Sequence, residues 1–157
     1  MSMGKFLAGF IVIASIVMGA GLYYTQVYAY FDEVAADQVE LRLTSLASGQ
    51  PEPILAENVQ AIDSNSSPIR FRACFTTPMS LAMLTETYQP MTGAVPLNGP
   101  GWFDCYDAAE VGAALEAGTA TAFLGEANIR DGVDRVIAVF PDGRAYVWHQ
   151  LNEKYKD

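Results

Sequence analysis

Hydrophobic positions near the start of the chain form one unbroken block. About 19 residues, from Phe6 to Tyr24, carry no charge, and at about 1.5 Å per residue a helix of that length spans about 28 Å. This length is close to the hydrocarbon core of a bilayer. Tyrosines follow at the far end of the block, where their amphipathic rings suit the membrane–water interface. We therefore predict a transmembrane anchor over residues 1–25.

A cleaved secretory signal and a buried helix of a soluble protein are the alternatives to an anchor. Val27–Ala29 is a tolerable small-residue cleavage site, but the uncharged block is longer than a usual signal core and ends well before that site. Lys5 precedes the block, whereas several acidic residues follow it, so the positive-inside rule places the N-terminus in the cytoplasm. We expect a single-pass inner-membrane protein with a periplasmic domain.

Small residues recur along one side of the predicted anchor. Their spacings of four, seven and four place them on one helix face, which permits close approach of a second helix. Glycine and alanine are also common in any membrane helix, and the block has no strict G-x-x-x-G motif. We take as the candidate helix-docking face the residues Gly4, Ala8, Ser15 and Gly19.

Beyond the anchor, the pattern changes from helical to alternating. Apolar residues recur at helical spacing from Val27 to Val34, which predicts a helical stalk over residues 26–37. Alternation or short apolar runs then predict strands over residues 39–44, 54–62, 69–75, 120–124, 133–140 and 145–149. The turn Pro141–Arg144 joins the last two strands as a hairpin.

Two short helices are expected between these strands. Thr77 offers a hydroxyl cap before a helix over residues 79–84, and residues 89–101 form a loop rich in proline and glycine. Asp107 and Glu110 match a capping box in form, with Gly118 placed to end the helix. The order of elements predicts an α+β domain with a mainly antiparallel sheet over residues 38–157.

Composition narrows the classes of partner. The chain has 157 residues and a net charge of −9; without Lys5, 8 positive and 18 negative side chains remain, a net charge of −10. Such a domain repels nucleic acid and anionic lipid headgroups and attracts a basic partner. Acidic residues also simply keep an exported domain soluble. We expect the bilayer and a membrane protein complex as partners, and no nucleic acid.

Few residues have the types and spacing that catalysis needs. Cys74 and Cys105 are expected to form a disulfide in an oxidising compartment, with two buried free thiols as the alternative. His149 is the only histidine, which leaves catalytic triads incomplete and favours a hydrogen-bonded surface or core residue. The cap explains Asp107 and Glu110 without calcium. We therefore expect no catalytic residues, no cofactor and no metal site.

Four other side chains are candidate partner contacts. Trp102 and Phe103 follow the flexible loop, where large aromatics anchor a partner or fill the domain's own core. Arg70 and Arg72 are two residues apart and project from the same face of their predicted strand. They are expected to meet anionic groups of a partner or acidic residues of a neighbouring strand.

Three further stretches of the chain are Met3–Phe6, Ser67–Phe75 and Gly101–Cys105. Together they resemble an uncharacterised family of short, single-pass, membrane-anchored proteins from proteobacteria. The resemblance covers the whole chain and implies one N-terminal span followed by an outer domain. The family has no assigned activity, so the resemblance implies no catalytic residues.

These observations favour a non-enzymatic accessory or assembly subunit of a larger membrane complex, for instance a respiratory one. Its helix would pack against the complex, and its acidic domain would cover the outer face. The alternative is a membrane-tethered periplasmic binding or sensing module for a soluble basic partner. An enzyme of unrecognised type is the third interpretation.

Overall fold

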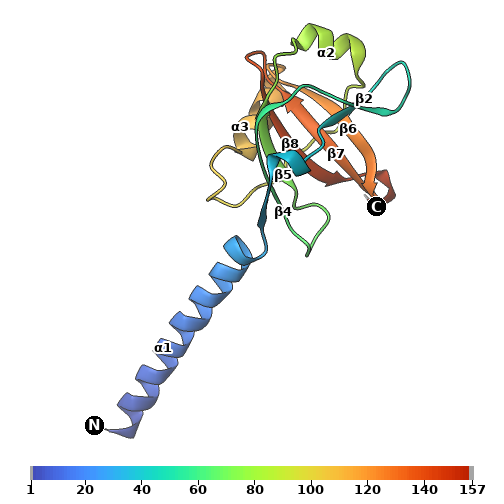
Figure 1. Cartoon of the computed structure of the whole chain (residues 1–157). Coiled ribbons are helices and arrows are strands. Elements are labelled where there is room, and N and C mark those ends of the chain that lie inside the picture. Colours follow the sequence, from blue (N-terminus) through green and yellow to red (C-terminus); the bar gives the residue numbers. More distant parts are fainter. Residues whose placement is uncertain (1, 156–157) are drawn as a thin grey trace.

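A long apolar helix projects from a sheet domain (Figure 1), as the computed structural model of residues 2–155 shows. Helix α1 runs over Met3–Tyr24, and none of its residues is buried. Ser2 caps it, because the Ser2 side chain accepts a hydrogen bond from the amide of Lys5. A π-helical turn over Thr25–Ala29 extends α1 toward the domain.

The domain is built on a six-stranded, wholly antiparallel sheet. Its strands, in spatial order, are β1 (Asp32–Val34), β4 (Glu57–Asp63), β5 (Arg72–Thr76), β8 (Arg144–Leu151), β7 (Val133–Val139) and β6 (Thr121–Arg130). A separate antiparallel pair is formed by β2 (Arg42–Thr44) and β3 (Pro51–Pro53). The α-helices are α2 (Leu81–Thr87) and α3 (Ala108–Ala117), and 3-10 turns lie at Ala36–Gln38 and Glu153–Tyr155. The predicted α+β class is confirmed.

Both faces of the sheet are buried, so its central strands carry few outward polar residues. In β8, Val147 belongs to one core together with Leu43 of β2 and Leu84 of α2. The next residue, Trp148, belongs to a second core together with Val111 of α3. Successive side chains of a strand point to opposite faces, and here each face has its own apolar cover.

The long loop between α2 and α3 covers the second core rather than projecting into solvent. The side-chain oxygen of buried Gln150 accepts bonds from the amide of Val95 and from Trp148 Nε1, both at 3.0 Å. Gln150 Nε2 donates to the carbonyl of Gly93 at 3.1 Å. A single side chain on β8 therefore holds the middle of the loop against the sheet.

The predicted disulfide between Cys74 and Cys105 is present and holds the end of the same loop. Cys74 lies on β5 and Cys105 lies just before α3, with their Cα atoms 6.2 Å apart. The bond links residues separated by 31 positions. Closing a loop of that length stabilises the fold by about 3 kcal/mol.

The predicted stalk over residues 26–37 is wrong beyond Ala29. Asp32–Val34 forms edge strand β1, in which Glu33 pairs with Ile62 of β4. Val34 packs against the first core, and Phe31 against the second. Burial of these two side chains and the backbone pairing override the helical spacing, so the domain begins at β1 rather than at residue 38.

Two other local predictions need correction. Ser80 caps α2 in place of Thr77, since Ser80 Oγ accepts from the amide of Met83 at 3.2 Å. Pro51–Pro53, which lies between the predicted strands 39–44 and 54–62, itself forms strand β3 and pairs with β2. Both prolines lie in a two-stranded ribbon, where a missing amide donor can be tolerated.

The prediction for α3 is confirmed at both ends. Asp107 Oδ1 accepts from the amides of Ala109 and Glu110, at 2.9 Å and 3.2 Å. Gly118 adopts φ 75° at the C-terminal end, the left-handed conformation that glycine adopts without strain. The Glu110 side chain does not complete a capping box and instead pairs with Arg144 at 3.1 Å.

Candidate functional site

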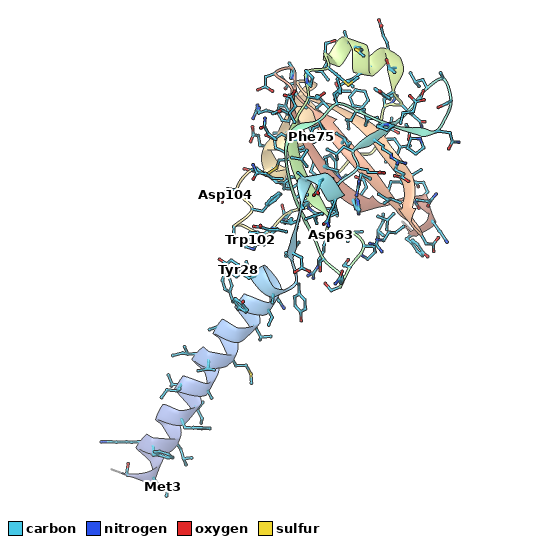
Figure 2. All side chains as sticks on the ribbon, in the orientation of Figure 1. Met3, Tyr28, Asp63, Phe75, Trp102 and Asp104 are labelled. Atoms are coloured by element: carbon cyan, nitrogen blue, oxygen red, sulfur yellow. A yellow bond between two sulfur atoms is a disulfide. The ribbon has the colours of Figure 1, made fainter. Side chains whose placement is uncertain are left out.

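The end of the apolar helix is fixed to the domain by a cluster of aromatic side chains around Trp102 (Figure 2). The Trp102 ring stacks on Tyr28, with centroids 5.9 Å apart, and meets Phe31 edge-on at 6.3 Å. Trp102 Nε1 donates a hydrogen bond to the carbonyl oxygen of Val27. The neighbouring Phe103 is buried in the second core. Trp102, a predicted partner contact, thus contacts the chain's own helix, and Phe103 fills the core.

Local structure explains how Trp102 reaches the helix. A turn brings the amide of Phe103 to the carbonyl of Pro100 at 3.0 Å, which directs the intervening residues toward α1. Cys105 lies three residues beyond Trp102 and is held to β5 by the disulfide. The indole is therefore supported from both sides, by a tight turn and by a covalent link to the sheet.

A hollow of about 660 Å³ lies beside this cluster, between the end of the helix and the loop. Tyr23 and Gln26 line its helical side, and the residues Leu97–Gly101 line the loop side. Arg70 and Arg72 complete the wall. Among the described residues that line the hollow there is no carboxylate, although the whole chain has 18 acidic and 9 basic side chains.

Arg72 is buried, and its guanidinium secures the loop. Its Nε donates to the carbonyls of Leu97 and Asn98 at 3.1 and 3.2 Å, and its Nη2 donates to Asn98 at 2.9 Å. Its Nη1 donates to the carbonyls of Ile69 and Phe71. Burial lowers the pKa of Arg72 from its usual value. Arg72 thus bonds to backbone carbonyls, which neither of the two expectations from the sequence, a partner's anionic groups or acidic residues of a neighbouring strand, had named.

Arg70 differs from Arg72, because among the described residues no carboxylate pairs with its charge. Its guanidinium lies over the rings of Tyr30 and Phe31, 5.6 and 5.7 Å from their centroids. The Nη1 atom is buried and has no hydrogen-bond partner. In the part of the chain that the structure describes, Arg70 forms no ion pair. A buried charged donor without an acceptor costs free energy.

A second polar centre, around His149, is closed. His149 Nε2 accepts from Arg135 Nε at 3.0 Å, so the proton lies on Nδ1, 2.9 Å from the carbonyl of Pro68. Phe71 stacks on the imidazole, with centroids 4.8 Å apart. Burial, followed by the charge of Arg135, lowers the pKa of His149 to about 4. Both ring nitrogens are occupied, which agrees with the expected hydrogen-bonded core histidine.

The four small residues of the predicted docking face lie on α1 and are exposed. A methyl group added at Gly4 or Gly19 would meet no described atom within 4 Å beyond the adjacent residues and the backbone of its own helix. Ser15 Oγ donates to the carbonyl of Ile11 at 2.8 Å, inside its own helix. The face is therefore unoccupied by this chain, and its docking role stays a prediction. Within residues 2–155, no group of three or more metal-ligating side chains was found.

Sequence reasoning missed the helical side of the hollow and the carbonyls that bind Arg72. Tyr23 and Gln26 carry no motif, and a backbone carbonyl has no sequence signature. The available signal was the Asn98–Gly101 stretch, whose two glycines and proline mark a tight turn directly before Trp102.

Comparison with known proteins covers the domain but not the helix. Residues 41–157 match a family of unknown function, DUF6446. The matched region begins just before β2 and leaves out α1 and β1. No curated protein matches the chain, and no solved structure does so either. Evidence for the span is therefore physical: Met3–Ala29 is long and apolar enough to cross a membrane, a test that a signal sequence also passes.

Proposed function

The chain belongs to the DUF6446 family of unknown function, and we propose that it is a non-enzymatic accessory or assembly subunit of a larger membrane protein complex. In this proposal α1 is a retained anchor in the inner membrane of a proteobacterium. The N-terminus lies in the cytoplasm and the sheet domain in the periplasm. The disulfide between Cys74 and Cys105 supports an oxidising compartment for the domain.

The observation that carries this proposal is the fixed junction between helix and domain. A simple tether works with a flexible linker, yet here Trp102 stacks on Tyr28 and bonds to the backbone of Val27. Strand β1 begins only three residues after Ala29. Rotation of the helix about its axis is therefore coupled to rotation of the domain. A partner that contacts one face of α1 would also meet a defined face of the domain.

The exposed small-residue face of α1 supplies the matching membrane surface. Without side chains of any size at Gly4 and Gly19, the backbone of a second helix can approach closely, which favours helix association in lipid. The proposed docking therefore uses α1 for contact within the bilayer and the domain for contact outside it.

Affinity purification of the tagged full chain from its native membrane tests this proposal. In mild detergent, a stoichiometric membrane partner is expected to copurify. Leucine at all four positions of the docking face should abolish that recovery while the protein stays in the membrane. A matched control places leucine on the opposite helix face, at Phe6, Phe10, Ile13 and Val17.

The control variant is expected to copurify the partner as the unmodified chain does. Recovery of the unmodified protein without any stoichiometric membrane partner would contradict the proposal. Equal recovery with the docking-face variant would reduce α1 to a tether.

The second candidate function is a tethered binding module for a soluble basic partner. The chain carries 18 acidic and 9 basic side chains, and this net charge of −9 attracts a basic ligand. Binding of this kind weakens steeply with salt. A soluble basic protein that copurifies at low salt and is lost at high salt would favour this function over the first.

A further inference from the structure

We propose that the hollow around Arg70 binds the phosphate of an anionic phospholipid from the surrounding membrane. We call the hollow the headgroup site; Tyr23, Gln26, Arg70, Ile69 and Leu97 are among its lining residues. The inference rests on the proposed retention of α1 in the membrane. It does not depend on a protein partner.

The site lies at the height of lipid headgroups. Helix α1 has 22 residues, and at about 1.5 Å per residue it is about 33 Å long, slightly more than a hydrocarbon core of about 30 Å. Tyr23 in its last turn then lies at the edge of the core, and Gln26 lies about 5 Å farther out. The headgroup layer occupies about 5–8 Å on each side of the core. Both residues line the hollow, so its helical wall coincides with that layer.

The charge of the site selects an anion. Arg70 is held over Tyr30 and Phe31, while its buried Nη1 lacks an acceptor. Arg70 lines the hollow and forms no ion pair among the described residues, so a phosphate there supplies the missing counter-charge, and the guanidinium fork suits a phosphodiester. Among the described lining residues no carboxylate is present to pair with the quaternary ammonium of a choline headgroup. The site therefore favours phosphatidylglycerol-type lipids over phosphatidylcholine.

The walls of the site favour a lipid over a free phosphate. Apolar side chains of Val27, Phe31, Ile69 and Leu97 flank the arginines, and they offer contact to the glycerol and the first acyl carbons. The helical wall continues directly into the exposed apolar surface of α1. A phosphate attached to acyl chains can follow this surface into the bilayer, whereas a soluble anion gains nothing from it.

This site changes the expected behaviour of the acidic domain at a membrane. A net charge of −9 for the chain predicts repulsion from an anionic leaflet. The headgroup site is a local exception that faces the bilayer. Attraction there and repulsion elsewhere would hold the domain in one orientation on the membrane surface.

Native mass spectrometry of the purified full chain in mild detergent tests the proposal. Phosphatidylglycerol is expected to remain bound at concentrations where phosphatidylcholine does not. Arg70→Gln should weaken phosphatidylglycerol binding about ten-fold, the effect of losing one charge-assisted hydrogen bond. Arg144→Gln is the matched control, because it removes the same charge from a side chain already paired with Glu110 and Asp142; binding should not change.

Two further measurements distinguish a lipid from a soluble phosphate and provide a second variant in case the first does not fold. Soluble glycerol phosphate at millimolar concentration should not displace the lipid; full displacement would overturn the assignment to a lipid. Arg70→Met keeps the apolar stem of the side chain and should show the same loss if Arg70→Gln does not fold. Equal binding by the unmodified chain and either folded Arg70 variant, or equal binding of the two lipids, would also overturn it.

The outcome is independent of the proposed accessory role. If phosphatidylglycerol binding requires Arg70 but no membrane partner copurifies, the headgroup site stands and the accessory role falls. If a partner copurifies but lipid binding does not depend on Arg70, the accessory role stands and the headgroup site falls.

Discussion

Trp102 of the domain stacks on Tyr28 of the apolar helix, with ring planes inclined by only 15°. Tyr28 precedes β1 and Trp102 follows α2, so their contact is made only in the folded chain. It converts two structural units into one body with a defined angle between them.

Replacing Trp102 should release the helix from the domain. Trp102→Ala removes the stacking on Tyr28 and the hydrogen bond to Val27, and should lower the free energy of unfolding by about 1–2 kcal/mol. Chymotrypsin cleavage between Tyr28 and Phe31 should become faster. Trp102→Phe keeps a ring in place, so its cleavage rate should lie between those of the unmodified protein and Trp102→Ala. Equal cleavage rates of all three proteins would show that the contact does not hold the junction.

Removing the disulfide should destabilise the domain without abolishing its sheet. The Cys74→Ala, Cys105→Ala double variant should lose about 3 kcal/mol of unfolding free energy in urea titrations. Cys105→Ala alone should lose a similar amount, because either change opens the same loop. In the unmodified protein, thiol-reactive reagents should label no cysteine before reduction. Two reactive thiols at that stage would contradict the bond.

His149 makes stability fall as the pH falls. Its pKa is about 4 in the folded protein, below the ordinary value of 6.5, so the unfolded chain binds more protons between these values. Stability is fully present above about pH 6.5 and is lost progressively down to about pH 4, by at most about 3 kcal/mol.

Urea unfolding at pH 7 and pH 5 measures this loss. The variant His149→Gln cannot titrate, so its stability should change less than that of the unmodified protein over the same interval. The depressed pKa values of Asp131 and Asp142 start from 3.8 and act mainly below this window. An equal change in both proteins would show that His149 is not the responsible group.

The two arginines of the hollow should respond differently to substitution. Arg72→Met leaves the carbonyls of Leu97 and Asn98 without their donor and should cost about 2–4 kcal/mol. Faster amide hydrogen exchange is expected in residues 93–101. Arg70→Met breaks no hydrogen bond and should cost less than about 1 kcal/mol. Equal losses would contradict the division between a structural and a ligand-facing arginine.

Local signals in the sequence account for much of the fold. The alternation over Ile69–Phe75 predicts β5. Asp107 as the N-cap and Gly118 as the C-cap predict α3. Caps and strand periodicity depend only on nearby residues. The β6–β7 hairpin was missed, although Asp131–Gly132 is a recognised turn dipeptide. These features need no knowledge of distant contacts.

The errors lie where distant contacts decide the outcome. The helical spacing from Val27 to Val34 predicts a stalk, but β4, 27 to 31 residues farther along the chain, pairs with Asp32–Val34. The candidate contacts Arg70, Arg72 and Trp102 were found by residue type. Their separate roles depend on carbonyls and rings that only the folded chain brings near, so the sequence left open whether each contacts a partner or the domain itself.

The connection from Cys74 through Cys105 to Trp102 also orders the maturation of the protein in time. In the proposed topology the thiols can be oxidised only after the domain has left the reducing cytoplasm. Until then the turn that presents Trp102 to the helix lacks its covalent support from β5. The fixed angle between the membrane helix and the domain would thus be established last, after export. A partner whose binding requires this angle would bind only copies in which the disulfide has formed.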